Sequence, residues 1–272
     1  MTDGGQSTAD DARLDLPQVM VHRDGDLLAA AAAARLVTRL VDAQVARGSD
    51  AYTAQGSASL VLTGGRTGIA VLEQVCASPA RDAVDWAKVD LYWGDERFLP
   101  SGHPDRNETQ ARRALLDHVP VDPRRVHVME PSDGRFGDDP EAAAKDYAWI
   151  LANRLPDFDV CLLGVGEEGH VASLFPFSSG VRERERKAVA VRDCPKPPPT
   201  RISMTLPTIA GSTEVWLMTT GASKASAVSM ALTGAEPVRV PAAGARGFQR
   251  TLWLLDEAAA AELPPMFAPP ES

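Results

Sequence analysis

Short apolar segments alternate with glycine-containing turns and with longer amphipathic segments along most of this chain. Apolar runs of strand length occupy residues 58–62, 89–93 and 160–165, and glycine follows or ends each of them. A longer segment begins at Leu27, carries apolar residues at helical spacing and meets a stop signal at Gly48. Strands that alternate with helices in this way predict a mostly parallel sheet with helices on both faces.

The same pattern continues to the end of the chain. Further strands are predicted at residues 188–191, 201–204, 214–219 and 251–255, and further helices at residues 68–76, 108–116, 140–155 and 223–232. Asp105 or Asn107 is available to cap the helix over 108–116. Prolines over 195–199 predict an extended connection, and alanines after Asp256 predict a last helix. We expect a flexible N-terminal tail over 1–16 and a single α/β catalytic domain over 17–265.

Composition places the chain among globular proteins and excludes several partners. Hydrophobic residues make up 44% of the sequence, the formal net charge is -9, and the pI is about 5.1. A nucleic-acid partner would require a basic surface, so we expect none. The apolar run over 27–34 is too short to cross a bilayer and is followed by Arg35 and Arg39. We therefore expect a cytoplasmic protein without a membrane partner, and a monomer.

Neither a disulfide framework nor a metal centre is indicated. The three cysteines form no CxxC pair, and the five histidines show no HxxxH or HxH spacing. The sequence therefore predicts no metal and no other cofactor.

The turn over 63–68, with the sequence TGGRTG, joins a predicted strand to a predicted helix. Backbone N–H groups and the positive end of a helix dipole make such a turn an anion site, with phosphate as the natural ligand. Gly64, Gly65, Arg66 and Thr67 are the candidate binding residues. The alternative is an ordinary tight turn, because the segment matches neither a Walker A loop nor GxGxxG.

Three cations lie at the predicted ends of strands, where ligands bind in open α/β sheets. They are Arg97, Arg201 and Lys224. Guanidinium and ammonium groups together suit a sugar phosphate, which carries nearly two negative charges. Each of them taken alone also fits an ordinary surface charge.

A single histidine, His170, lies in a glycine-rich loop directly after the apolar run over 160–165. Gly164, Gly166 and Gly169 permit a sharp turn there, which favours a functional base over a histidine that only caps or packs. The acidic residues that could orient such a base or balance its charge are Asp95, Glu96, Glu167 and Glu168. No nucleophile motif of the GxSxG kind is present.

Five segments together resemble the 6-phosphogluconolactonase family. They read LTGGRTG, YWGDERFLP with RNETQARRALL, LLGVGEEGHVASLFP, PPPTRISMTLPTI and TTGASKASAV, and they occur in the order of that family. The resemblance implies a modified Rossmann-like α/β sheet and hydrolysis of 6-phospho-D-glucono-1,5-lactone, a small sugar-phosphate lactone, in the oxidative pentose phosphate pathway. The related glucosamine-6-phosphate deaminases continue the histidine loop with a Phe-Asn-Glu-Pro run that this chain lacks.

The resemblance also assigns roles to individual residues. His170 would be the general base that activates water, and Gly64, Gly65 and Thr67 would form the phosphate loop. Arg97 and Lys224 match the phosphate-binding cations of the family, and Arg201 matches the arginine after its proline-rich loop. Asp95, Glu168 and Gly169 would support the base.

Three positions depart from the family pattern. Arg66 replaces the usual serine and Gly68 the usual proline of the phosphate loop, while Glu168 replaces the usual aspartate before Gly169 and His170. These departures concern phosphate affinity and the orientation of the histidine.

Two other functions fit the same motifs. An amino-sugar-phosphate deaminase or isomerase would use a base for proton transfer between sugar carbons. A sugar-phosphate sensor would bind without chemistry, and bacterial sensors with this fold carry an N-terminal helix-turn-helix, for which we see no pattern before residue 17.

Overall fold

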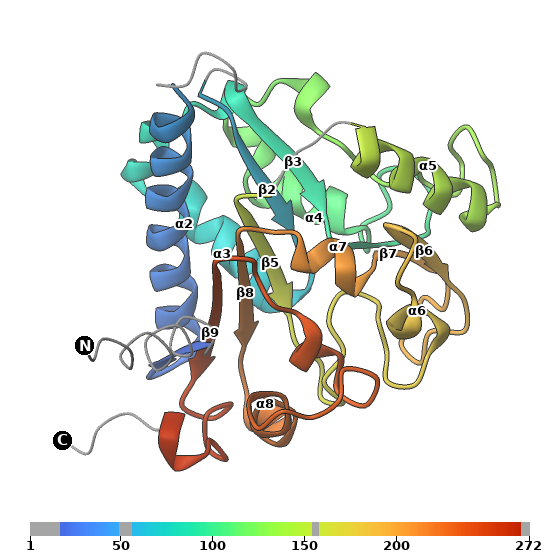
Figure 1. Cartoon of the computed structure of the whole chain (residues 1–272). Helices are drawn as coiled ribbons and strands as arrows, with labels where there is room; N and C mark the ends of the chain where they lie inside the picture. The colour runs from blue at the N-terminus through green and yellow to red at the C-terminus, as the bar shows by residue number, and fades with distance from the viewer. Residues whose placement is uncertain (1–16, 49–55, 154–157, 268–272) are drawn as a thin grey trace, which may run out of the picture.

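The computed structural model describes residues 17–48, 56–153 and 158–267 (Figure 1). The expected tail over 1–16 lies outside the described residues, and so does the predicted end of the helix over 140–155.

A six-stranded, wholly parallel sheet forms the centre of the molecule. In spatial order its strands are β1 (Gln18–His22), β9 (Arg250–Asp256), β8 (Glu214–Thr219), β5 (Val160–Gly164), β2 (Ala58–Leu62) and β3 (Val89–Trp93). The predicted α/β class is confirmed, although the sequence analysis assigned no strand to β1.

The register of the parallel strands brings their carboxyl ends to one edge of the sheet. Leu62 pairs with Trp93, Gly164 with Met218, and Thr219 with Leu255. The segments that leave β2, β3, β5 and β8 therefore start at the same edge. This edge is where ligands bind in open α/β sheets.

Two long helices pack against each other and against the sheet (Figure 1). Helix α2 (Gly25–Gly48) starts where the Asp24 carboxylate accepts a hydrogen bond from the N–H of Leu27. Helix α3 (Gly65–Ala77) follows β2 after only Thr63 and Gly64. It begins earlier than predicted, so Gly65 to Thr67 belong to its first turn.

A second, three-stranded antiparallel sheet lies beside the carboxyl edge. Its order is β4 (Asp95–Arg97), β7 (Arg201–Met204) and β6 (Ala188–Val191), and helix α5 (Pro140–Asn153) packs on β6 and β7. No strand is predicted at β4. Their pairing with β7 fixes Asp95 and Arg97 relative to Arg201.

Helix α4 (Asn107–Ala114) is not capped by Asp105 or Asn107, so that prediction is wrong. Its N-cap residue is Arg106, and the first N–H groups, those of Asn107 and Glu108, donate to the carboxylate of Glu96 from β4. A buried carboxylate from a distant segment therefore satisfies the helix start.

Two further predictions are wrong. The alanines after Asp256 form turns instead of a helix, because Pro264 and Pro265 follow closely and the Asp256 carboxylate accepts the N–H of Ala259. The segment over 195–199 is bent instead of extended, because the Arg201 guanidinium hydrogen-bonds three of its carbonyl groups.

The remaining helices are short. They are α6 (Ser179–Arg182), α7 (Leu206–Ala210), α8 (Ala225–Leu232) and the 3-10 helices η1 (Pro79–Ala83), η2 (Trp86–Lys88), η3 (Leu116–His118), η4 (Pro123–Arg125), η5 (Ala222–Lys224), η6 (Pro241–Gly244) and η7 (Pro265–Phe267). The described part of the chain contains no helix that is long and apolar enough to span a membrane.

Glu96 joins the small sheet to helix α4, and its removal tests that connection. Its carboxylate accepts N–H groups of Arg97, Asn107 and Glu108 and lies 3.7 Å from the Arg106 guanidinium. Burial raises the pKa of Glu96 to about 7, although Arg106 and these N–H groups oppose the shift.

We predict that Glu96→Ala lowers the free energy of unfolding by about 3 to 5 kcal/mol, because the variant leaves three N–H groups without their acceptor and removes one of the two carboxylates beside the buried Arg106. Urea denaturation above the pKa of Glu96 measures the loss. The exposed Glu185, changed to alanine, is the control and leaves stability nearly unaltered. Equal stability of both variants would contradict this role for Glu96.

Candidate functional site

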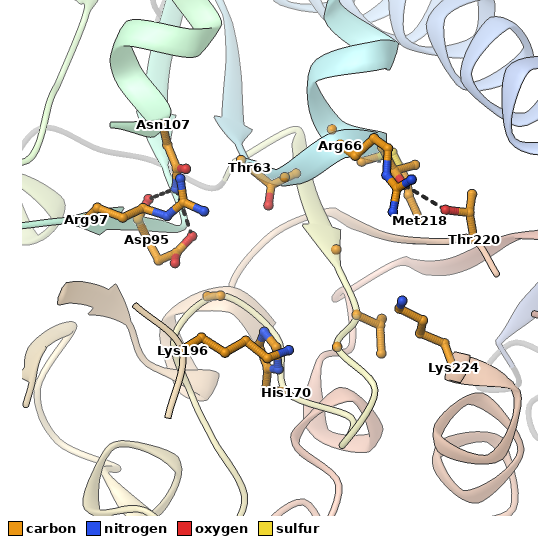
Figure 2. A pocket seen from close by; sticks show the side chains of 18 of the residues that line it. Thr63, Arg66, Asp95, Arg97, Asn107, His170, Lys196, Met218, Thr220 and Lys224 are labelled. Carbon is orange, nitrogen blue, oxygen red and sulfur yellow. Dashed lines mark hydrogen bonds between the residues drawn. The ribbon is translucent and has the colours of Figure 1, made fainter. Parts of the chain in front are cut away.

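A pocket of about 240 Å³ opens at the carboxyl edge of the main sheet (Figure 2). The predicted site residues that line it are Gly64, Gly65, Arg66, Thr67, Asp95, Arg97, His170, Arg201 and Lys224. Glu168 and Gly169 do not line the pocket. The structure thus brings together residues from β2 to α8 that are separated by more than half of the chain.

The N-terminus of α3 forms one wall. Gly64 is the N-cap residue in extended backbone with no side-chain cap, and Gly65 has a φ of +78°. The first N–H groups of the helix therefore face the pocket without a side-chain acceptor, at the positive end of the helix dipole. This wall can hold an anion.

Gly64 is required for close packing at this wall. A Cβ atom on Gly64 would lie 1.9 Å from Oδ1 of Asn107, at the start of α4. The Asn107 amide group donates in turn to the carbonyl group and carboxylate of Asp95. The two helix starts therefore approach each other across the pocket, and neither leaves space for a side chain at position 64.

Three further cations line the same pocket. Arg66 is exposed and makes no ion pair with any described residue. Lys224 contacts the carboxylate of Glu167 at 3.4 Å and the hydroxyl group of Ser223 at 2.9 Å. Arg97 donates from Nη1 to the carbonyl oxygen of Asp105. Figure 2 shows Arg66 and Lys224 at one end of the pocket and Arg97 at the other.

Arg201 differs from these three cations because its donors are already occupied. It is only 5% exposed, and it donates to the carbonyl groups of Lys196, Pro197 and Pro198 at 3.1 to 3.2 Å. The carboxylate of Asp95 lies 4.0 Å away. This arrangement points to a clamp for the proline-rich loop more than to a ligand contact.

His170 is held by its own glycine loop. A Cβ atom on Gly166 would lie 2.0 Å from two atoms of the imidazole ring, and the Gly166 N–H donates to the His170 carbonyl group at 2.9 Å. The ring also stacks on Phe175, with centroids 4.4 Å apart. Glycine at 166 therefore makes room for the ring that Phe175 fixes.

The electrostatic environment keeps His170 neutral. Burial lowers its pKa below the ordinary value of 6.5, and the nearby Glu168 carboxylate opposes the shift only in part. Nδ1 is buried and lies 3.2 Å from Oε1 of Glu168, outside hydrogen-bond geometry. This position of Nδ1 leaves Nε2 as the ring nitrogen available to the pocket.

Glu168 contacts a second pocket residue that the sequence analysis missed. Its Oε2 accepts a hydrogen bond from Nζ of Lys196 at 3.3 Å. Burial acts to raise the pKa of Glu168, but its own backbone N–H, His170 and Lys196 together hold that pKa below its ordinary value. The Glu168 carboxylate is therefore charged at neutral pH. It occupies the position of the family's aspartate.

Lys196, Asn107, Thr63 and Thr220 line the pocket without having been predicted. The sequence feature that could have identified Lys196 is its position between prolines, a few residues before Arg201. Asn107 gave no such signal, because its place depends on Glu96. Among the described residues, no group of three His, Cys, Asp or Glu side chains could hold a metal ion.

The fold and the pocket define an α/β protein with cations beside a helix start and a partly buried, neutral histidine on the facing loop. The profile of the family described as glucosamine-6-phosphate isomerases/6-phosphogluconolactonase matches residues 23–253. The chain belongs to this family.

Relatives at high identity carry a single name. The 6-phosphogluconolactonase of Streptomyces coelicolor is 58% identical over 95% of this chain and 99% of its own length. The 6-phosphogluconolactonase of Mycobacterium tuberculosis is 51% identical over 90% of this chain and 98% of its own length.

Solved structures agree with the fold. The 6-phosphogluconolactonase of Trypanosoma brucei has a TM-score of 0.75 at 26% identity and covers 91% of this chain and 99% of its own. A monomeric glucosamine-6-phosphate deaminase has a TM-score of 0.72 at 22% identity, with 90% and 99% covered, which shows the shared fold alone.

The packing of Gly166 against His170 leads to a prediction that does not depend on activity. We expect the wild-type imidazole to titrate below 6.5 in a ¹H–¹³C NMR titration. Gly166→Ala displaces the ring towards water, so the pKa of His170 rises towards its ordinary value. Gly48, where a Cβ atom meets nothing within 4 Å, provides Gly48→Ala as the control. An unchanged pKa in Gly166→Ala would refute this packing argument.

Proposed function

We propose that this protein hydrolyses 6-phospho-D-glucono-1,5-lactone to 6-phospho-D-gluconate, the second step of the oxidative pentose phosphate pathway, with His170 as the general base. The observation that carries the proposal is the juxtaposition of two parts of one pocket: the cation-flanked start of α3 and the neutral imidazole of His170. The names of relatives that match nearly the whole chain support the same reaction.

The substrate phosphate binds at the start of α3 in this proposal. Its oxygens accept N–H groups of Gly65, Arg66 and Thr67, and the side chains of Arg66 and Lys224 add positive charge. Lys224 exchanges its contact with Glu167 for the phosphate. The phosphate group then fixes the sugar ring in the pocket, which makes attack on the ring an oriented reaction.

His170 activates the attacking water. Nε2 takes a proton from water as the water oxygen forms a bond with the lactone carbonyl carbon, and the carbonyl oxygen becomes negative. When the tetrahedral intermediate collapses, the bond from carbon to the ring oxygen breaks. The imidazolium returns the proton to that oxygen, which becomes a hydroxyl group, and the carboxylic acid product loses its own proton to solvent.

The neutral state of His170 suits this role. A base must be deprotonated before it can act, and burial ensures this state at neutral pH. Glu168 offers a negative charge beside Nδ1, which stabilises the imidazolium that forms during the reaction. General-base catalysis of this kind contributes roughly a hundred- to ten-thousandfold to the rate.

The deaminase reaction is the second candidate, because the matched family includes glucosamine-6-phosphate isomerases. The loop after His170 continues with the sequence VASLFP, which lacks the acidic residue of the deaminase run. Release of ammonia from glucosamine 6-phosphate, without acceleration of lactone hydrolysis, would favour the deaminase.

The first test compares lactone hydrolysis with its spontaneous rate in the same buffer. We predict that wild-type protein accelerates formation of 6-phosphogluconate from freshly generated lactone, and that His170→Ala lowers kcat by about a hundredfold or more. His118, an exposed histidine far along the chain from the loop, gives His118→Ala as the control with full activity. Equal turnover by His170→Ala and wild type would remove His170 from the mechanism.

The pH dependence of kcat/KM tests the electrostatics of the base. Because neutral His170 is the active form, activity is lost as pH falls through its pKa, and the acid limb lies below 6.5. Glu168→Gln removes a carboxylate that raises this pKa, so the acid limb moves to lower pH. Glu185→Gln is the matched control. A limb that moves to higher pH in Glu168→Gln would show that Glu168 does not favour the imidazolium.

A further inference from the structure

We propose that Lys196 is a second catalytic residue, whose ammonium group stabilises the negative charge that develops on the lactone carbonyl oxygen. The inference rests on the proposed function and adds the oxyanion-stabilising group to it. Attack by water makes that oxygen negative, and a donor aimed at such an oxygen is commonly the largest single contribution to catalysis.

Lys196 is the pocket cation that is connected to the base. Glu168 bridges the two residues, with Oε1 at 3.2 Å from Nδ1 of His170 and Oε2 at 3.3 Å from Nζ of Lys196. Figure 2 shows the side chains of Lys196 and His170 on the same side of the pocket. In our proposal, a water bound to Nε2 attacks the lactone carbonyl carbon. The carbonyl oxygen then lies close enough for the Lys196 ammonium group to reach it.

Of the other cations of the pocket, two donate to backbone carbonyl groups and two lie where α3 begins. Arg201 is buried and its donors hold carbonyl groups, while Arg66 and Lys224 lie at the end of the pocket where α3 begins. Arg97 contacts Asp105 at the opposite end from Lys224. Lys196 is 44% exposed along its side chain, so its ammonium can turn from Glu168 towards an incoming oxyanion.

The backbone at Lys196 is fixed, which a catalytic cation requires. Arg201 donates to the carbonyl groups of Lys196, Pro197 and Pro198, and the Ser173 hydroxyl group and Asp95 carboxylate surround its guanidinium. Buried Arg201 therefore acts as a positioning residue for Lys196. This assignment explains why an arginine in the pocket has its donors directed at a loop.

The charges around the base remain balanced during the reaction. Glu168, Lys196 and Asp95 are the charged groups that act on His170. Before attack, Glu168 balances Lys196 and His170 is neutral. After attack, the imidazolium and the ammonium face the Glu168 carboxylate and the oxyanion, so the net charge of the site and substrate is unaltered. Protonated His170 and an oxyanion thus form together without an uncompensated buried charge.

The test is steady-state kinetics of Lys196→Met and Lys196→Arg, with Lys187→Met as control, because the Lys187 side chain is exposed outside the pocket. We expect Lys196→Met to lower kcat about a hundred- to a thousandfold while KM changes by only a few-fold. Lys196→Arg, which keeps the charge, recovers a large part of kcat, and the control retains wild-type values.

A separate readout is the NMR titration of His170. Because the positive charge of Lys196 lowers the pKa of His170, that pKa rises in Lys196→Met and not in the control. If Lys196→Met raised KM and left kcat unaltered, Lys196 would have a binding role and the inference would be overturned. Wild-type kcat and KM in Lys196→Met would also overturn it, because the contact between Lys196 and Glu168 would then be only a surface ion pair. Wild-type protein that does not exceed the spontaneous rate would instead overturn the proposed function itself.

Discussion

The common edge formed by parallel strands is the constraint on which the rest of the structure depends. Because β2, β5 and β8 run side by side in register, the segments that leave them emerge together. The start of α3, the histidine loop and the turn that carries Lys224 therefore meet at one pocket. Asp256, at the end of β9, also holds the N–H of Gly221 and so fixes that turn. A different strand order would separate these residues.

Buried polar groups then fix the pocket at a second level. The Glu96 carboxylate accepts N–H groups at the start of helix α4, and Arg201 bends the proline-rich loop. The Asp95 carboxylate accepts hydrogen bonds from Ser173 and Asn107. The contact between Ser173 and Asp95 joins segments that are distant in the sequence, and the others fix neighbouring turns. Because burial of a charged or polar group without a partner is costly, these groups favour the one arrangement in which each has its partner. These contacts hold the elements that carry the pocket residues in place.

Local patterns predicted the strands of the main sheet well, because buried strands are short apolar runs between glycines. They missed β1 and β4. Strand β1 has no fully buried residue and is stabilised by pairing with β9, and the polar residues of β4 become a strand only beside β7. Residues that a motif identified, such as His170, line the pocket, and their roles stay predictions. Lys196 and the clamp made by Arg201 were missed because no motif identifies them. Lys196 is placed by its contact with Glu168, and the clamp depends on where the Arg201 guanidinium points within its own loop.

The most direct test of this account is a crystal structure of the wild-type protein with 6-phosphogluconate bound. We expect the phosphate group at the start of α3, against Gly65 to Thr67 and Lys224. We expect the C1 carboxylate within hydrogen-bond distance of His170 Nε2 and close to Lys196. A product bound in the reverse orientation, or with its phosphate group outside the turn after β2, would contradict the claim that one ligand joins the anion site to the histidine.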